Sequence, residues 1–192
     1  ATVSQAQNIF DFLAELHVSK PDLPIIIDPV MGDKGRLYVD PALVGVFQER
    51  VPSLASLITP NAFEAQTLTG LEHPTLGALV KAFRAMGLDE GLITSAETLL
   101  AETEQRAILC FERGATDFHL TRHEALTFDR EPNGVGDFVA ALSASLYGEG
   151  DLLSRTDRIA RALVALLRAT QAANAPELAL VRAQDEWMAA LA

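Results

Sequence analysis

The residues at 134–137, Gly-Val-Gly-Asp, have the types and spacing needed to bind an anion and remove a proton. Gly134 and Gly136 allow a tight turn that aims several backbone N–H groups at one point, and a predicted helix over 137–147 follows. The backbone donors and the helix dipole would hold Asp137 ionised beside an arriving anion. Such a carboxylate is suited to act as a general base toward an attacking hydroxyl. The alternative is a glycine turn with this aspartate as the helix N-cap.

Other polar residues occur where predicted strands end. In chain order these strand ends carry Asp28, then Thr59, Pro60 and Asn61, then Thr94 and Ser95. Open α/β sheets bind ligands outside the carboxyl ends of their parallel strands. We therefore expect these side chains to share one edge of a sheet with the glycine turn.

Asn61 and Glu64 are three residues apart where a helix is predicted to begin, so both can face the same edge. The amide suits a phosphate, and the carboxylate suits a hydrated cation. Mg²⁺ that is bound with nucleotide phosphates needs only a few carboxylates, often through water, and Asp28 and Asp33 could add to that set. The alternative for the first two residues is a helix-capping pair, and for Thr94 and Ser95 it is capping at a strand end.

The periodicity of the chain predicts the elements that must position these residues. Helices are expected at 4–18 (with Ser4 as N-cap), 42–51, 63–68, 76–86, 137–147, 152–173 and 177–191, and residues 32–35 are expected to form a loop. Strands are expected at 25–27, 54–59, 91–95, 107–111, 117–122 and near 125–128, with a hairpin turn at 113–115. This alternation predicts one α/β domain over 1–192, a three-layer α/β/α structure with a mostly parallel central sheet.

Taken together, these segments resemble pyridoxal kinases of the ribokinase-like superfamily. The resemblance rests on Asp-Pro-Val-Met-Gly-Asp-Lys-Gly at 28–35, Leu-Tyr-Val at 37–39, Ile-Thr-Pro-Asn-Ala-Phe-Glu-Ala at 58–65, Ile-Thr-Ser at 93–95 and Gly-Val-Gly-Asp at 134–137. It implies a ribokinase-like fold and phosphorylation of the 5'-hydroxymethyl group of pyridoxal, pyridoxine or pyridoxamine. ATP as co-substrate and Mg²⁺ are implied with it.

The resemblance also implies a role for each matching residue. Asp137 would be the catalytic base that contacts the substrate, and residues 134–136 would form the anion hole. Mg²⁺ would be held by Asp28, Asp33 and Glu64. The implied ATP contacts are Asp28, Tyr38, Asn61, Glu64, Thr94, Ser95, Arg122, Gly134, Val135 and Gly136.

Similar kinases carry additional strands and the residues that grip the vitamin ring before the point matched by residue 1. We therefore expect this chain to be the C-terminal, nucleotide-binding portion of a kinase domain whose N-terminal strands are missing. Such a portion would leave one sheet edge unpaired and apolar surface uncovered, which predicts association. The resemblance implies a homodimer at full length.

Composition excludes several classes of protein. The formal net charge of -11 opposes a nucleic-acid or anionic-membrane surface, which would need clustered Lys and Arg. Cys110 is the single cysteine, so no intramolecular disulfide or cysteine-based zinc site can form, and a reducing cytoplasmic setting fits best. No apolar run approaches the ~20 residues that span a bilayer.

Two alternatives to a pyridoxal kinase stay open. Hydroxymethylpyrimidine and phosphomethylpyrimidine kinases share the Asp-Pro-Val-Met and Thr-Pro-Asn segments. They commonly carry cysteine at the position of Asp137, and the Gly-Asp-Lys-Gly continuation at 32–35 looks more like a pyridoxal kinase. The second alternative is a catalytically inactive ATP-binding or vitamin-carrier protein.

Overall fold

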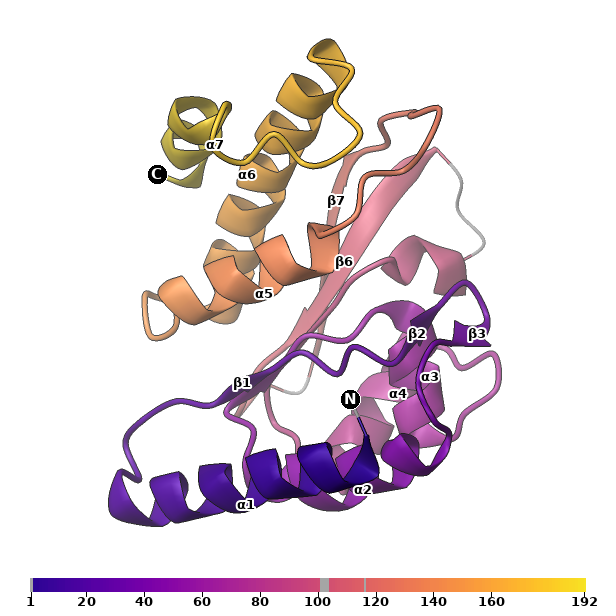
Figure 1. Ribbon diagram of the computed structural model, residues 1–192, viewed down its shortest axis with the longest axis vertical. Coiled ribbons are helices and arrows are strands. Elements are labelled where there is room, and N and C mark those ends of the chain that lie inside the picture. Colours follow the sequence, from indigo (N-terminus) through magenta and orange to yellow (C-terminus); the bar gives the residue numbers. More distant parts are fainter. Residues whose placement is uncertain (1, 101–103, 116) are drawn as a thin grey trace.

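The computed structural model describes residues 2–100, 104–115 and 117–192 and is built around a five-stranded sheet (Figure 1). The strand order is β1 (Ile26–Ile27), β4 (Leu57–Ile58), β5 (Gly91–Ile93), β6 (Gln105–Phe111) and β7 (His119–Glu124). The β1–β4 and β4–β5 pairs are parallel, while β6 is antiparallel to both of its neighbours. β7 therefore runs with β5, and only β6 is reversed within this sheet, which confirms the expected mostly parallel arrangement.

Helices cover both faces of the sheet. The first set comprises α1 (Val3–Ser19), α2 (Ala42–Arg50), α3 (Ala62–Thr69) and α4 (Leu76–Ala85); the second comprises α5 (Val135–Ser145), α6 (Leu152–Ala172) and α7 (Gln184–Leu191). Figure 1 shows the two sets on opposite sides of the sheet, so the three-layer prediction is confirmed. Two short 3₁₀ helices, η1 (Val51–Ser53) and η2 (Ala96–Leu99), follow α2 and β5.

β6 is the best example of a strand buried on both faces. Ala107, Leu109 and Phe111 belong to the hydrophobic cluster on the α1–α4 side. Ile108 packs in the α5–α6 cluster and Cys110 packs with the first residue of α6. Because successive strand residues point to opposite faces, an unbroken apolar run is needed to contact both helical layers.

Three predicted elements differ in the structure, and the N-cap of α1 is Thr2 instead of the expected Ser4. The strand expected near 125–128 is wrong, because the pairing of β7 with β6 ends where Glu124 meets Gln105, the first residue of β6. Helix α7 begins at Gln184 instead of 177, and the preceding segment turns back onto α6, where the Ala179 N–H donates to the Thr170 hydroxyl at 3.1 Å.

The loop expected at 32–35 is in fact the tight turn of a two-stranded antiparallel hairpin, β2 (Gly32–Asp33) and β3 (Arg36–Leu37). Lys34 and Gly35, the two residues between the strands, have φ values of 49° and 77°. Positive φ at both central residues is the geometry that two-residue hairpins favour. The hairpin leaves the carboxyl end of β1 and stands over the edge where the candidate site lies.

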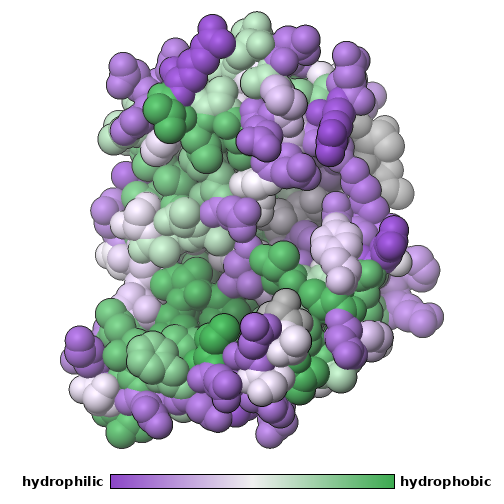
Figure 2. Space-filling view, viewed as in Figure 1, coloured by the Kyte–Doolittle hydropathy of each residue, from purple (hydrophilic) through white to green (hydrophobic). Residues whose placement is uncertain are grey.

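The sheet ends at β1 on one side, and apolar side chains are exposed nearby. On α1, Ile9 is 55% exposed, Phe12 62% and Val18 83%. Figure 2 shows apolar side chains gathered over this helix. The predicted association of the chain therefore has a physical basis in this surface. Among the described residues, no helix has the length and apolar character needed to cross a membrane.

Candidate active site

The glycine turn at the start of α5 leaves backbone donors without a capping side chain. Gly134 is the N-cap residue and has a φ of 90°, a left-handed conformation that glycine adopts without a Cβ penalty. Its carbonyl accepts from the Phe138 N–H at 2.9 Å, which closes the first helical turn. The N–H groups of Val135 and Gly136 lie in that first turn, where no intrahelical acceptor is available. Such an end attracts an anion.

Asp137 lies in the first turn of α5, three residues after the N-cap, so its interpretation as an N-cap is wrong. The residue is exposed, and its carboxylate lies back toward the turn: a Cβ placed on Gly134 would be 4.0 Å from its Oδ2. A negative charge is favourable at this end of a helix. The carboxylate and the open N–H groups therefore face the same space.

Asp28 reaches that space from the end of β1. A Cβ placed on Gly136 would be 3.9 Å from its Oδ2. Burial first, and then the nearby charge of Asp137, raise the pKa of Asp28 to about 6. The Thr59 hydroxyl, at the end of β4, is buried without a hydrogen bond of standard geometry but lies close enough to offset part of that rise. Two acids and an unsatisfied hydroxyl thus meet beside the glycine turn.

Asn61 and Glu64 form a capping box at the start of α3. The Asn61 Oδ1 accepts from the Glu64 N–H at 2.9 Å, and the Glu64 Oε2 accepts from the Asn61 N–H at 2.9 Å. The other carboxylate oxygen accepts from Met31 and Gly32 N–H groups at 2.8 and 3.2 Å. Asn61 Nδ2 donates to the Gly32 carbonyl at 2.7 Å. The capping alternative is confirmed, and the same pair fixes the base of the β2–β3 hairpin.

The ionised form of Glu64 remains unfavourable despite these hydrogen bonds. Burial raises its pKa to about 6, and the three backbone N–H groups lower it only in part. The charge of Asp28 acts in the same direction as burial. Two neighbouring carboxyl groups with raised pKa values are typical of a functional site.

Asp33 and Tyr38 belong to the hairpin. Asp33 Oδ1 accepts from the Lys34 N–H at 2.8 Å within the turn. Tyr38 is anchored through its backbone, whose N–H donates to the Met31 carbonyl at 2.8 Å, and its ring is 63% exposed. Slight burial and the neighbouring charges of Asp33 and Glu64 raise the Tyr38 pKa. The phenol therefore lies near two acids predicted to take part in the site.

The predicted residues after β5 and on β7 lie along the same edge. Thr94 is fixed by its N–H, which donates to the Pro60 carbonyl at 3.0 Å, and it forms an isolated bridge with Asn61. Ser95 has a φ of 56° and caps η2. Arg122 is exposed on β7 opposite Ala107 of β6. Strand direction thus brings the predicted residues to one edge, while only some of them are in contact.

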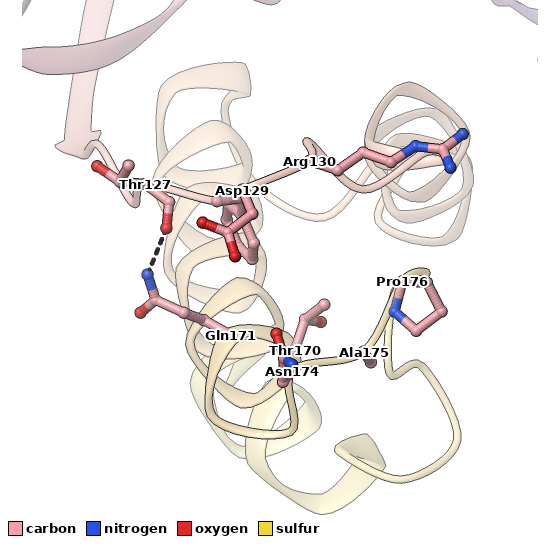
Figure 3. A pocket seen from close by; sticks show the side chains of 9 residues that line it. Thr127, Asp129, Arg130, Thr170, Gln171, Asn174, Ala175 and Pro176 are labelled. Atoms are coloured by element: carbon pink, nitrogen blue, oxygen red, sulfur yellow. Dashed lines mark hydrogen bonds between the residues drawn. The ribbon is translucent and has the colours of Figure 1, made fainter.

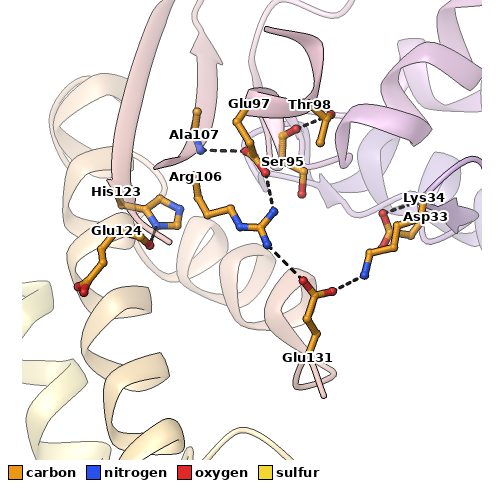
Figure 4. A network of polar contacts seen from close by, with 10 residues as sticks. All are labelled: Asp33, Lys34, Ser95, Glu97, Thr98, Arg106, Ala107, His123, Glu124 and Glu131. Carbon is orange, nitrogen blue, oxygen red and sulfur yellow. Dashed lines mark hydrogen bonds and ion pairs between the residues drawn. The ribbon is translucent and has the colours of Figure 1, made fainter. Parts of the chain in front are cut away.

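Sequence reasoning missed a chain of charged side chains at this edge (Figure 4). Arg106, at the start of β6, donates from Nη1 to the buried Glu97 at 3.0 Å and from Nη2 to Glu131 at 3.2 Å. The other oxygen of Glu131 is paired with Lys34 of the hairpin turn. Because the partners are up to 97 residues apart, they leave no local pattern in the sequence. The reversed direction of β6 was the one available signal that Arg106 would lie at this edge.

Sequence reasoning also missed a pocket of about 320 Å³ beside the segment that leads to the glycine turn (Figure 3). It is lined by residues 127–130 and by the end of α6 with the following residues 174–176. Gln171 Nε2 donates to the Thr127 carbonyl at 2.6 Å and ties the two walls together. Along the chain, residues 131–133 lie between this pocket lining and Gly134, the N-cap residue of α5.

The acids of this edge fit a phosphate-bound cation better than a protein-only metal site. Within the described part of the chain, no group of three or more His, Cys, Asp or Glu side chains is arranged to hold a metal. Mg²⁺ on nucleotide phosphates requires fewer protein ligands, often through water. Asp28, with a raised pKa and an unsatisfied hydroxyl beside it, is the donor that a cation would relieve most directly.

Comparison with known proteins identifies the family. A family model described as phosphomethylpyrimidine kinase matches residues 3–175. The chain belongs to this family. Among its relatives, "Pyridoxal kinase PdxY" of Granulibacter bethesdensis is 31% identical over 189 residues, covering 94% of this chain and 65% of the relative. "Pyridoxine/pyridoxal/pyridoxamine kinase" of Bordetella avium is 34% identical over 182 residues, covering 92% and 60%. The resemblance to pyridoxal kinases is confirmed, and the chain spans less than two thirds of these relatives.

Solved structures support the fold of this phosphomethylpyrimidine kinase family member. The pyridoxal kinase of Leishmania donovani in complex with ADP and ginkgotoxin superposes with a TM-score of 0.80 at 23% identity, over 95% of this chain and 66% of that one. The pyridoxal kinase of Lactobacillus plantarum gives a TM-score of 0.76 at 24% identity, over 95% and 67%. The expected ribokinase-like α/β fold is confirmed.

Proposed function

We propose that this chain is the nucleotide-binding portion of a kinase that phosphorylates the 5'-hydroxymethyl group of pyridoxal, pyridoxine or pyridoxamine with ATP. The observation that carries the proposal is the glycine turn of α5, whose uncapped N–H groups share one space with Asp137 and with Asp28 at the end of β1. Phosphoryl transfer needs an anion-binding cradle, a base and an in-line acceptor, with little covalent chemistry from the protein. The glycine turn is proposed as the cradle and Asp137 as the base.

In the proposed reaction, the N–H groups at 134–136 receive the transferred phosphoryl group. Donors fixed by a folded turn need no reorganisation as charge develops on the phosphoryl oxygens. The exposed Asp137 carboxylate accepts the proton of the attacking hydroxyl, which then bonds to phosphorus as ADP leaves. The position of that carboxylate close to the turn suits this role. The hydroxyl oxygen that loses its proton is the oxygen that attacks phosphorus, so base and phosphoryl group must be close together.

Mg²⁺ is proposed as the accompanying cation, held by Asp28 with Asp33 and Glu64 nearby. When bound, it balances charge on the phosphate oxygens. Both Glu64 oxygens already accept backbone N–H groups, so its contribution to the cation would pass through water. Asp33 is partly exposed on the hairpin; one of its oxygens accepts from the Lys34 N–H, which leaves the other oxygen for the cation.

The pocket beside residues 127–130 is proposed to take the nucleotide base. With the phosphates at Gly134, only residues 131–133 lie between the glycine turn and the pocket lining at 127–130 along the chain, which supports this placement of the base. Tyr38, Asn61, Thr94, Ser95 and Arg122 are proposed as further nucleotide contacts along the edge. The Asn61 side-chain oxygen already accepts a hydrogen bond in the capping box. Its Nδ2 donates to the Gly32 carbonyl and is the group that could also donate to the nucleotide.

The remaining proposals concern the whole protein. We propose that residues 1–192 form the nucleotide-binding part of a single ribokinase-like domain and that a full-length version is a homodimer in the cytoplasm. The exposed apolar residues of α1 and the β1 edge support association with further protein. The acidic net charge of -11 supports small-molecule partners over nucleic acid.

Phosphomethylpyrimidine kinase is the second candidate activity, because the family model that matches residues 3–175 carries this description. Asp137 argues for the first candidate, since the pyrimidine kinases commonly have cysteine at this position. Both candidates share the same nucleotide chemistry. They differ in the acceptor, which is the alcohol of the vitamin in the first candidate and a pyrimidine alcohol or its phosphate in the second.

Two measurements test these proposals. Isothermal titration of Mg-ATP into residues 1–192 should give saturable binding with one site; absence of heat and of any thermal stabilisation would contradict the nucleotide-binding assignment. ATP consumption by a version extended to the length of the relatives should then depend on pyridoxal. Turnover with hydroxymethylpyrimidine but not with pyridoxal would favour the second candidate.

A further inference from the structure

The chain of charges in Figure 4 has a fixed end and an exchangeable end. Glu97 is buried, and its second oxygen accepts from the Ala107 N–H at 2.9 Å, so the Arg106 end is anchored. Glu131 is 52% exposed and Lys34 is 72% exposed. Exposed ion pairs contribute little net free energy, so the outer pair can separate readily.

Two cations share the single Glu131 carboxylate. Arg106 contacts one oxygen and Lys34 the other. Arg106 lowers the Lys34 pKa while Glu131 raises it more strongly, which means that the two cations are close enough to repel each other. Lys34 in turn lowers the Glu131 pKa, so this carboxylate is ionised at neutral pH. Lys34 and Arg106 can therefore stay this close only with an anion between them.

Glu131 connects this ion pair to the glycine turn along the chain. Glu131 is three residues before Gly134, and Lys34 occupies the turn of the hairpin that stands over the same edge. Lys34 and Arg106 come from β-structure, while Glu131 lies in an irregular segment with no strand or helix of its own. The carboxylate can therefore move away while the cation on β6 stays in place.

We propose that Lys34 and Arg106 receive phosphate groups of the nucleotide and that Glu131 occupies this cation pair until the nucleotide arrives. This inference rests on the proposed function. A polyphosphate carries more negative charge than one carboxylate, so it replaces Glu131 between the two cations. The Glu131 carboxylate therefore competes with the phosphates and weakens their binding. When no nucleotide is bound, it reduces the repulsion between the two cations.

The sign of the Glu131→Gln effect tests the inference. Titration of Mg-ATP into residues 1–192 at low salt should show tighter binding, by about two- to fivefold, which is the range that an exposed ion pair supports. Lys34→Gln should weaken binding by a similar factor, and the double variant should lose the gain. Binding of adenosine, which has no phosphate, should be unchanged by all three, and the gain should shrink in ~0.5 M salt.

Glu149→Gln is the matched control. Glu149 is 56% exposed and pairs with Arg158 at 2.9 Å, away from the candidate site, so its substitution should leave Mg-ATP binding unchanged. Arg106→Lys, which keeps the charge next to the buried Glu97, serves as the second probe of the anchored cation, with thermal unfolding used to confirm folding.

The outcomes separate the two proposals. Loss of Mg-ATP binding by the unmodified chain would overturn both the proposed function and this inference. If the unmodified chain binds Mg-ATP but Glu131→Gln binds it more weakly or equally well, only the proposal for the Lys34–Arg106 cation pair would be overturned. An equal shift for adenosine would also overturn it, because that result means the substitutions act through the structure of the pocket.

Discussion

Helices α3 and α5 begin at the same edge of the sheet, yet their first turns are built in opposite ways. At α3, Asn61 and Glu64 satisfy each other's backbone N–H groups, and Glu64 is buried. At α5, a glycine in a left-handed conformation takes the N-cap position without any side-chain bond, and Asp137 in the first turn is exposed. A satisfied helix start holds structure, while an unsatisfied one has donors available for a ligand.

The strongest test of this contrast is Asp137→Asn. In a version extended to the length of the relatives, we expect kcat to fall roughly 10²- to 10⁴-fold, because the proposed general base is lost while the shape of the turn is kept. Mg-ATP affinity should change far less. Pyridoxal turnover measured under saturating ATP would check this, and full retention of kcat would contradict the assignment of the base.

The opposite test is Glu64→Gln, which alters the satisfied helix start. The amide nitrogen cannot accept, so at least one of the N–H groups of Met31, Gly32 and Asn61 loses its partner. We expect the free energy of unfolding to fall by about 1–3 kcal/mol, measured by urea denaturation. Thr75→Ala, which removes the simple N-cap of α4, is the control and should cost about 1 kcal/mol. A stability equal to that of the unmodified chain would contradict a structural role.

Gly134→Ala addresses the unsatisfied start. Its φ of 90° makes any Cβ unfavourable, and we expect a loss of about 1–2 kcal/mol in stability together with weaker Mg-ATP binding. Gly70→Ala is the matched control, since Gly70 has a φ of 68° at the end of α3 and its Cβ would meet nothing within 4 Å. The control should lose similar stability and keep its affinity. Equal losses of affinity would remove the distinction between the two helix starts.

The smallest expected effect concerns pH. Burial raises the pKa of Asp28 to about 6, so the folded chain binds a proton more strongly than the unfolded chain, and stability falls as pH rises from about 4 to about 6. Asp28→Asn should remove this part of the fall and stabilise the chain by about 1 kcal/mol at pH 7.5, since the partly solvated site moderates the penalty. Thermal melts at pH 4.5 and 7.5 check the sign. A variant less stable than the parent at pH 7.5 would contradict it.

The sequence predicted the architecture, and it placed the candidate residues at one edge of the sheet, because strand exits follow directly from apolar runs. Asp28 and Asn61 could be placed at that edge from their positions after such runs, and the glycines at 134 and 136 indicated the turn. The capping bonds of Glu64 could be stated only as an alternative, because the same spacing serves a cap and a ligand. Its two further bonds, to Met31 and Gly32, depend on a hairpin that was not predicted.

The charged chain from Glu97 to Lys34 was beyond sequence reasoning for a different reason. Arg106 reaches the edge of the candidate site because β6 runs against its neighbours: Ile93, the last residue of β5, pairs with Leu109, so the first residues of β6 extend past the end of β5. The hairpin prediction implied this direction. It carried no information on which carboxylate would meet the arginine, since the partners come from three separate segments.

The reversed strand also bears on how the chain folds. β6 and β7 are joined by a short connection and pair over six residue pairs, so this hairpin closes a small loop and can form early. The parallel β1–β4 pair aligns residues that are 31 positions apart. The entropy cost of closing this longer segment, which contains a helical crossover, must be met before the strands can pair. We therefore expect the β6–β7 hairpin to gain protection from amide hydrogen exchange before β1, the strand that precedes Asp28, so the edge of the candidate site is completed last.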